Sequence, residues 1–503
     1  MDDFFETVAG MLGDQVAADH IKLIACLLAT YPLAEVYRRL PADNPTSRHL
    51  LSIAYAVFAL VFVLQLYVGA LHIVITSLFT YYWMRSYRAK NGPGINFVVV
   101  LISMSICHII RQIQGDEGDT KLDYSGVLMM GAIKLSSFGF NVLDGRVGGN
   151  TDYNKQMKID RYPSLIEYFG WLCYFGGLFV GPTCEYMEYY RFTNFFFLSP
   201  DKKISPYKPT IRLVLFGVLF ASITAFVGPT YNYYRLLEND YLTLPFHKRL
   251  LYIYITGFVW RCKFYCVWGL AEGSCVLSQF GYNGIKDGKH RWDRLTNADW
   301  IAVETSQSMQ NTSTRWNRCT TNWLRHYVYE RLSPPSANAS GGTKTKKKSS
   351  GHALMATYIV SGIWHGYHPG YYVLFCNIGL IQMLGRRVRR AVRPLVMSAE
   401  DVTQPLPVWK KAYDIIGNLV TFMLGGILVG SFELLYLSRT LIVWKSIHYI
   451  HFWGYLITWI GLSTIEPMLF KMQKRRKEQA EAAKKKKLLG DNTERIVMQL
   501  EIK

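Results

Sequence analysis

Charged residues are scarce in this sequence, and acidic residues are the scarcer kind. Only 18% of the 503 residues are Asp, Glu, Lys or Arg, whereas 50% are hydrophobic and 15% are aromatic. A soluble chain of this length would be expected to form several domains with about a quarter of their residues charged. The composition therefore excludes a soluble multidomain enzyme.

Cysteine is also infrequent, with nine residues, an odd number that falls mostly inside apolar stretches. Small buried thiols explain this placement better than a disulfide framework does. Cys262 and Cys266 lie one helical turn apart, but no His or acidic cluster accompanies them to complete a metal site. We therefore expect no disulfide framework, no bound metal and no cofactor.

The chain has instead a series of long apolar runs. A helix needs about 20 residues to cross a hydrocarbon core of about 30 Å. Runs of this kind predict an all-α, polytopic transmembrane protein with about ten to twelve spans. They cover residues 21–37, 50–84 (long enough for two spans), 95–110, 126–143, 164–181, 211–231, 250–280, 353–384, 415–432 and 447–465.

Basic segments predict the orientation of the chain, because Lys and Arg accumulate in cytoplasmic loops. The strongest are residues 344–348 and 474–487, which we expect to be cytosolic. The N-terminal MDDFFETVAGMLGDQ is acidic where a signal peptide would be basic, so no cleavable signal is expected. We predict a polytopic domain over residues 1–470 and a basic cytosolic tail over 471–503, helical as far as Leu489 with a stop at Gly490.

The net charge of +20 comes largely from these basic segments. They flank membrane spans and no nucleic-acid-binding module is recognisable, so we expect no nucleic-acid partner. Contact with anionic headgroups of membrane lipids explains the charge better.

Polar residues inside the apolar runs indicate where function lies, because an ionisable group within a membrane usually faces a cavity or a partner. Together they predict an internal polar chamber. They are His365 and His368 in SGIWHGYHPGYY, with Lys134, Asn141, Asp144, Glu167, Glu185, Arg261, Lys263 and Glu272.

The segment QNTSTRWNRCTTNWLRHYVYERL, residues 310–332, lacks any long apolar run. Aromatic residues alternate with arginines at roughly helical spacing, which predicts an amphipathic element that lies on the membrane or re-enters it. The aromatic residues are Trp316, Trp323 and Tyr327, and the arginines are Arg318, Arg325 and Arg331.

RWNRCTTNWL followed by SGIWHGYHPGYY resembles the paired signature of the membrane-bound O-acyltransferase family. Three further stretches look like its phospholipid-remodelling branch, the lysophospholipid acyltransferases, so the resemblance runs from about residue 120 to about 380. These stretches are IKLSSFGFNVLDG, YPSLIEYFGWLCYFGGLFVGPTCEY and GLAEGSCVLSQFGYNG with RWDRLTNADWIAVE.

The resemblance implies that His365 is the catalytic histidine and Asn317 its partner. An acyl-CoA thioester is already activated, so the transferase needs a base for the attacking hydroxyl rather than a covalent nucleophile, and a neutral imidazole suits that task. Asn317 would either fix the tautomer of His365 or donate to the oxyanion, and the sequence leaves both roles open. His368 has no counterpart role.

The resemblance also implies the substrates, acyl-CoA and a lysophospholipid, and residence in the endoplasmic reticulum membrane. Arg315, Arg318, Arg325 and the Lys344–Lys348 cluster are candidates to attract CoA phosphates, although the lysines equally fit positive-inside residues. The candidate substrate-binding residues are Trp316, Arg318, Trp323, Arg325, Trp364 and Glu185. The sequence leaves open whether the protein forms a homo-oligomer.

Two alternative functions keep some weight. A transporter also has many spans and buried charges, but it would predict internal repeats, and none is visible in this sequence. A protein or peptide acyltransferase of the same family would keep Asn317 and His365 and use a different acceptor.

Residues 338–384 carry two topological expectations. Asn338 lies in the sequon NAS, and the lysines that follow it predict a cytosolic loop without a glycan, on the face where acyl-CoA enters. The length of residues 353–384 and the central HGYHPG break predict a pair of helices that turns back on itself.

Overall fold

The computed structural model describes residues 2–11, 18–41, 43–114, 123–195, 204–333, 351–401 and 404–501. Within these ranges the chain is almost entirely helical, and the only paired strands are the short antiparallel β1 (Ile285–Lys286) and β2 (Lys289–His290). The all-α prediction is therefore confirmed. The Lys344–Lys348 cluster and Asn338 lie outside the described residues.

The helices of the first half are α1 (Asp2–Met11), α2 (Ala18–Arg39), α3 (Pro45–Val57), η1 (Phe58–Val63), α4 (Tyr67–Ser86), α5 (Gly92–Ile113), α6 (Ser125–Val147), α7 (Asp152–Met157), α8 (Leu165–Leu172), η2 (Phe175–Gly177), α9 (Tyr186–Phe195), α10 (Tyr207–Val227), η3 (Tyr234–Leu237), α11 (Asn239–Leu242) and α12 (Phe246–Leu277). Those of the second half are α13 (Trp300–Glu304), α14 (Met309–Arg315), α15 (Arg318–Trp323), η4 (Leu324–Tyr329), α16 (Glu330–Leu332), α17 (Gly351–His365), α18 (Pro369–Val392), η5 (Arg393–Val396), α19 (Pro407–Leu434), α20 (Leu437–Ser446) and α21 (Ile450–Glu501).

Five helical stretches among the described residues are long and apolar enough to cross a membrane. Five further helices have 20 residues or more but contain more polar or charged positions: α2, α4, α12, α18 and α21. The architecture is thus that of a polytopic membrane protein. The five qualifying stretches are Pro45–Val63, Gly92–Ile113, Ser125–Val147, Tyr207–Val227 and Pro407–Leu434.

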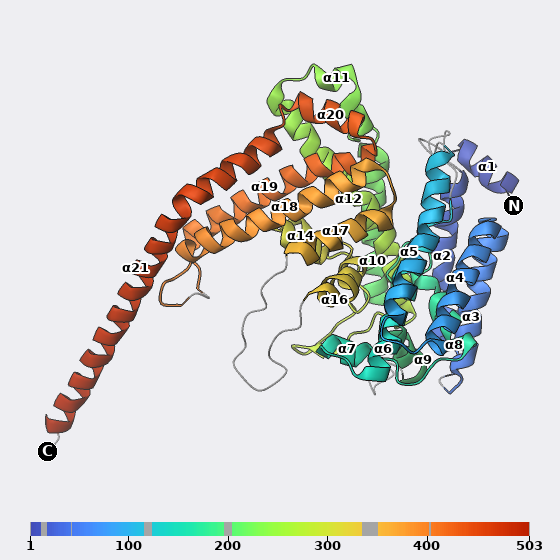
Figure 1. The fold of residues 1–503 in the computed structure, drawn as a ribbon, viewed down its shortest axis with the longest axis horizontal. Coiled ribbons are helices and arrows are strands. Elements are labelled where there is room, and N and C mark those ends of the chain that lie inside the picture. The colour runs from blue at the N-terminus through green and yellow to red at the C-terminus, as the bar shows by residue number, and fades with distance from the viewer. Residues whose placement is uncertain are drawn as a thin grey trace.

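The buried side chains form two main cores. Helices α2 to α9 enclose the larger one, which also takes in Trp323, Tyr327 and Trp364 from distant parts of the chain. The second core lies among α12, α18, α19 and α20. Figure 1 shows α1 to α5 on one side of the molecule and α18, α19 and α21 on the other, with α10 and α12 between them.

Small residues bring α12 close to its neighbours on both sides. On the α10 side, the position of a Cβ added to Gly269 lies 3.9 Å from the backbone N of Gly217. On the α19 side, the position of a Cβ added to Gly257 lies 3.0 Å from the Cα of Gly426. Such contacts let helix backbones approach in a membrane, where close packing rather than the hydrophobic effect holds helices together.

α21 continues past both Pro467 and Gly490 as one helix of 52 residues and projects away from the rest of the protein (Figure 1). The predicted helix stop at Gly490 is therefore wrong, because a single glycine costs a helix only about 1 kcal/mol relative to alanine. The boundary at residues 470/471 and the cytosolic location of the tail stay predictions.

Candidate active site

His365 is the last residue of α17, at the turn into α18. Gly366 has φ +128°, a backbone conformation that residues with a Cβ rarely adopt, so glycine lets the chain reverse directly after the histidine. Pro369 then opens α18 with His368 as its N-cap. Tyr358 of α17 stacks on Phe375 of α18, as expected for two antiparallel helices, so the predicted pair that turns back is confirmed.

The turn is pressed against the end of α19. The backbone N–H of Gly370 donates to the carbonyl of Leu435 at 2.8 Å. A Cβ at Gly370 would lie 1.9 Å from the carbonyl oxygen of Ser431, so only glycine fits here without a shift of the backbone. The G in HPGYY thus fixes the position of His365 relative to α19.

The imidazole of His365 is surrounded by aromatic rings. Its centroid lies 4.6 Å from Trp364, 5.2 Å from Phe375 and 4.9 Å from Phe432. Within the described part of the chain, neither ring nitrogen of His365 has a protein hydrogen-bond partner. The ring is therefore positioned by packing and not by hydrogen bonds to other residues of the described chain.

Asn317 occupies a left-handed backbone conformation, with φ 44° and ψ 59°, and is the N-cap of α15. Its side-chain oxygen accepts from the backbone N–H of Thr320 at 3.5 Å. Asn tolerates this region better than most residues, and non-glycine residues held there cluster at functional sites.

Asn297 holds the first turn of α15 in place. Its backbone carbonyl accepts from the N–H of Arg318 at 2.8 Å, and its side-chain oxygen accepts from the N–H of Cys319 at 3.1 Å. Asn297 is buried and belongs to RWDRLTNADW, a stretch that carries the family resemblance, yet it was not among the predicted site residues. The presence of an Asn in that stretch was the sequence feature that could have identified Asn297 as a site residue.

The two signature segments meet on α6. Trp323 donates its indole N–H to Ser136 Oγ at 2.8 Å, and Trp364 donates to the carbonyl of Met129 at 2.9 Å. A series of packed rings also connects the two predicted catalytic residues. Trp316, next to Asn317, stacks on Trp260 with ring centroids 5.9 Å apart. Trp260 packs on Phe432, which contacts the ring of His365.

The three candidate tryptophans thus have different surroundings. Trp323 and Trp364 are buried, and both indole N–H groups bond to α6, so both help to pack the signature segments. Trp316 is only partly buried and lies against α12, 4.9 Å from Trp268 between ring centroids. Contact of any of the three with a substrate stays a prediction.

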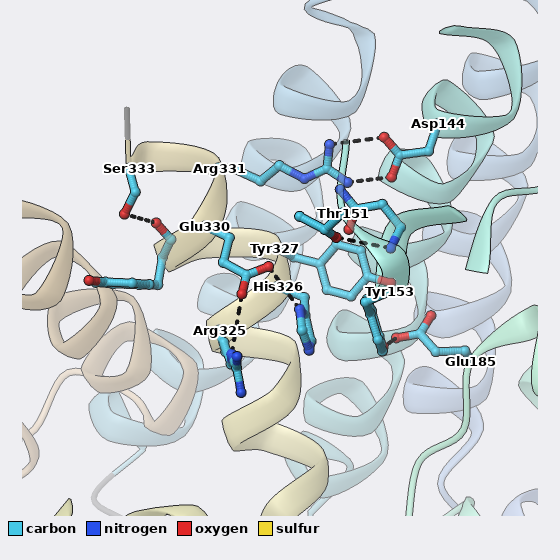
Figure 2. Close-up of polar contacts among 12 residues, drawn as sticks. Asp144, Thr151, Tyr153, Glu185, Arg325, His326, Tyr327, Glu330, Arg331 and Ser333 are labelled. Atoms are coloured by element: carbon cyan, nitrogen blue, oxygen red, sulfur yellow. Dashed lines mark hydrogen bonds and ion pairs between the residues drawn. The ribbon is translucent and has the colours of Figure 1, made fainter. Parts of the chain in front are cut away.

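The structure divides the predicted amphipathic segment into short pieces, α14, α15, η4 and α16, because Asn317 breaks the helix and η4 has π-helical hydrogen bonding. Arg325 is exposed and bonds to Glu330 at 3.2 Å (Figure 2). Arg315 lies 3.8 Å from Asp299, and Arg318 is half-buried. Phosphate binding by these arginines stays a prediction.

Glu185 belongs to a polar network of residues from several helices. Its carboxylate accepts from the Tyr153 hydroxyl at 3.0 Å (Figure 2) and from Asn141 Nδ2 at 2.8 Å. Tyr327 donates to the Asn141 side-chain oxygen at 2.8 Å. Burial raises the pKa of Glu185 to about 7, with Glu188 adding to the shift. The network joins α6, α7, the start of α9 and η4.

Two ion pairs flank this network. Arg331 of α16 bonds through two nitrogens to both oxygens of Asp144 at the end of α6 (Figure 2). Glu330 accepts from His326 Nδ1 at 2.9 Å, and this hydrogen bond lowers the pKa of Glu330. The His326 ring stacks on Tyr153 at 3.6 Å, which connects the second pair to Glu185.

The remaining polar residues of the apolar runs also bond to protein groups. Lys134 donates to the carbonyls of Trp171 and Leu172, each at 3.1 Å. Arg261 bonds to both oxygens of Glu304, and Lys263 bonds to Glu433 at 2.7 Å. These side chains connect helices to one another. Within the described residues, no cluster of three His, Cys, Asp or Glu could hold a metal ion.

The sequence profile of the membrane-bound O-acyltransferase family matches residues 148–425. A protein of Schizosaccharomyces pombe named lysophospholipid acyltransferase is 34% identical over 89% of this chain and 86% of its own length. A protein of the same name from Saccharomyces cerevisiae is 31% identical over 86% of this chain and 72% of its own length. Lysophospholipid acyltransferase 1 of Arabidopsis thaliana is 30% identical over 88% of this chain and 93% of its own length. The profile covers more than half of the chain and the relatives match most of it, so the chain belongs to the membrane-bound O-acyltransferase family.

Proposed function

We propose that this protein transfers an acyl chain from acyl-CoA to the free hydroxyl of a lysophospholipid, the step that remodels phospholipids in the Lands cycle. The names of the relatives support the lipid acceptor. The observation that carries the proposal is the environment of His365, a histidine packed among aromatic rings with both nitrogens unbonded to protein in the described part of the chain.

In this reaction His365 is the general base. One ring nitrogen takes the proton of the lysophospholipid hydroxyl while the hydroxyl oxygen attacks the thioester carbonyl. The carbon–sulfur bond then breaks, and the protonated His365 gives the proton to the leaving CoA thiolate, which restores the neutral base. The thioester is already activated, so no covalent acyl-enzyme is required. An unprotonated imidazole is available at neutral pH, because the ordinary pKa of histidine is about 6.5.

Asn317 supports this step in one of two ways. Its amide N–H donates to the oxyanion of the tetrahedral intermediate, or the amide orients the imidazole through its second nitrogen. The left-handed backbone at Asn317 supports a functional role, because such strain persists only where the surroundings impose it. Asn297 imposes it here, through its two hydrogen bonds to the first turn of α15.

The two substrates approach from different solvents. The lysophospholipid reaches the site from the bilayer, and the CoA group stays in water, where Arg318 and Arg325 are the described candidates to attract its phosphates. We place the protein in the endoplasmic reticulum membrane with its C-terminal tail in the cytosol, the side from which acyl-CoA arrives.

The test is an acyl-transfer assay on microsomes that contain the full-length protein, with labelled acyl-CoA and lysophospholipids of several headgroups. We expect transfer to at least one lysophospholipid, and His365→Ala should lower it by about 10²–10⁴-fold. His352→Ala is the matched control, because His352 is an exposed histidine on the same helix.

Three outcomes would contradict the proposal. Activity of His365→Ala within a few-fold of wild type would remove the general base. Labelling of a protein acceptor without any lipid product would indicate a protein acyltransferase. Substrate flux across the membrane without acyl transfer would indicate a transporter.

A further inference from the structure

A large cavity lies away from the candidate active site, between α18, α19, the start of α21 and the start of α14. Its volume is about 1030 Å³, at the upper end of the range of about 300–1,000 Å³ found for small-molecule pockets. Neither His365 nor Asn317 lines it. The proposed acyl transfer gives this space no role.

One end of the cavity is basic. Arg386, Arg389 and Arg393 line it from α18 and η5, and Lys410 lines it from α19. Lys410 is paired with Asp414 at 2.5 Å. Within the described residues, the three arginine side chains have no hydrogen-bond or acidic partner. Guanidinium groups bind phosphate in two-bond geometry, so this end suits a phosphate.

The rest of the cavity wall is mostly apolar, and its open side includes exposed residues of α19. Ile416, Leu419 and Val420 line it, yet they are 61%, 53% and 52% exposed. They belong to α19, one of the five candidate membrane spans. The opening therefore faces the region that bilayer lipid occupies, and an occupant can enter from the membrane without crossing water.

The length of the cavity fits an acyl chain. Its lining on α19 runs from Lys410 to Ile427, which corresponds to about 25 Å at 1.5 Å per residue. A phosphate at the arginines would leave the chain lying along Leu424 and Ile427. A basic end followed by a long apolar wall fits a ligand with one anionic group attached to a long hydrocarbon chain.

From this complementarity we propose that the cavity binds an anionic phospholipid of the bilayer as a non-substrate ligand. The opening beside α19 favours a bilayer lipid over a water-soluble donor such as acyl-CoA. The cavity is also connected to the site: Gln382, which lines it, donates to Ser313 Oγ of α14, the helix that leads to Asn317. The proposal goes beyond acyl transfer and does not depend on it.

The test measures lipid binding by the full-length protein, purified in detergent and stripped of lipid. Dioleoylphosphatidylserine and dioleoylphosphatidylcholine are titrated in mixed micelles, and bound lipid is counted by native mass spectrometry. We expect phosphatidylserine to bind at least tenfold more tightly. The triple variant Arg386→Gln, Arg389→Gln, Arg393→Gln should weaken its binding about tenfold or more, because even one lost charge-assisted hydrogen bond has this effect.

The matched control is Lys90→Gln, Lys286→Gln, Lys289→Gln, which removes the same charge from exposed positions outside the cavity and outside the basic segments. It should bind phosphatidylserine like the wild type. A second variant, Gly454→Leu, places a side chain inside the cavity: Gly454 lines it, and an added Cβ meets no atom within 4 Å. Leucine is also the better helix former, so this variant should fold and bind the lipid more weakly.

Equal binding of both lipids, or equal binding by the arginine variant and its control, would overturn the proposal. So would binding by Gly454→Leu as tight as that of the wild type. Stoichiometric displacement of phosphatidylserine by oleoyl-CoA from the wild type would assign the cavity to the acyl donor instead.

Discussion

Trp323 and Trp364 lie with their ring centroids 6.4 Å apart, although 40 residues separate them in the sequence. Trp323 follows Asn317 in one signature segment, and Trp364 directly precedes His365 in the other. Both indole N–H groups bond to α6, so this one helix sets the position of both segments.

Asn317 allows the amide to be separated from the backbone conformation. Asn317→Gly keeps the left-handed backbone at no steric cost and removes the amide. We expect it to remain folded and to lose about 10²–10³-fold in acyl transfer, the effect of a lost oxyanion donor. Asn317→Ala should lose as much activity and also melt at a lower temperature. Activity of Asn317→Gly within a few-fold of wild type would show that the amide plays no part in the reaction.

Asp144 and Arg331 should be strongly coupled. Removal of one partner leaves the other charge buried, so Arg331→Met should destabilise the protein by about 3–5 kcal/mol. Asp144→Asn combined with Arg331→Met should be less destabilised than the sum of the single changes, as measured by melting temperature in detergent. Lys158→Met, in the exposed pair with Asp160, is the control and should change stability by less than about 1 kcal/mol. Additive single effects would exclude the coupling.

Glu185 should make stability depend on pH. It lies between η2 and α9, outside the candidate spans, and burial raises its pKa from 4.5 to about 7. The folded state therefore binds the proton more tightly than the unfolded state. The stabilisation is complete below pH 4.5 and is lost as the pH rises to about 7, by at most about 1.4 kcal/mol per pH unit. Glu185→Gln cannot titrate, so its melting temperature should rise relative to wild type over this range. A constant difference between pH 4.5 and pH 8 would contradict the shift.

Asn338 should carry no glycan. The Lys-rich residues 344–348 that follow the sequon favour a cytosolic loop, where the glycosylation machinery has no access. We expect endoglycosidase treatment to leave the mobility of the protein from a eukaryotic membrane unchanged, in wild type and in Asn338→Gln alike. A mobility shift present only in wild type would place the loop in the lumen and reverse the proposed side of acyl-CoA entry.

The sequence by itself determined the class of this protein. Apolar runs of about 20 residues leave few structures other than membrane-spanning helices, because each backbone N–H and C=O must be bonded within the membrane. The motifs around Asn317 and His365 predicted the family, and the match over residues 148–425 confirms it. The turn at HGYHPG was also predictable, since Gly366 and Pro369 restrict the chain locally.

Only the tertiary structure decided how these residues are held. Periodicity and motif spacing report on neighbours within a few helical turns, whereas Asn297, Phe432 and Asp144 meet their partners through contacts that depend on the packing of whole helices. For the same reason the helical spacing of residues 310–332 did not reveal the break at Asn317. The hydrogen bonds from Arg318 and Cys319 to Asn297 hold the chain at this break, and Asn317 accepts from Thr320. The cavity beside α19 is likewise formed by several helices together, and no single one of their sequences predicts it.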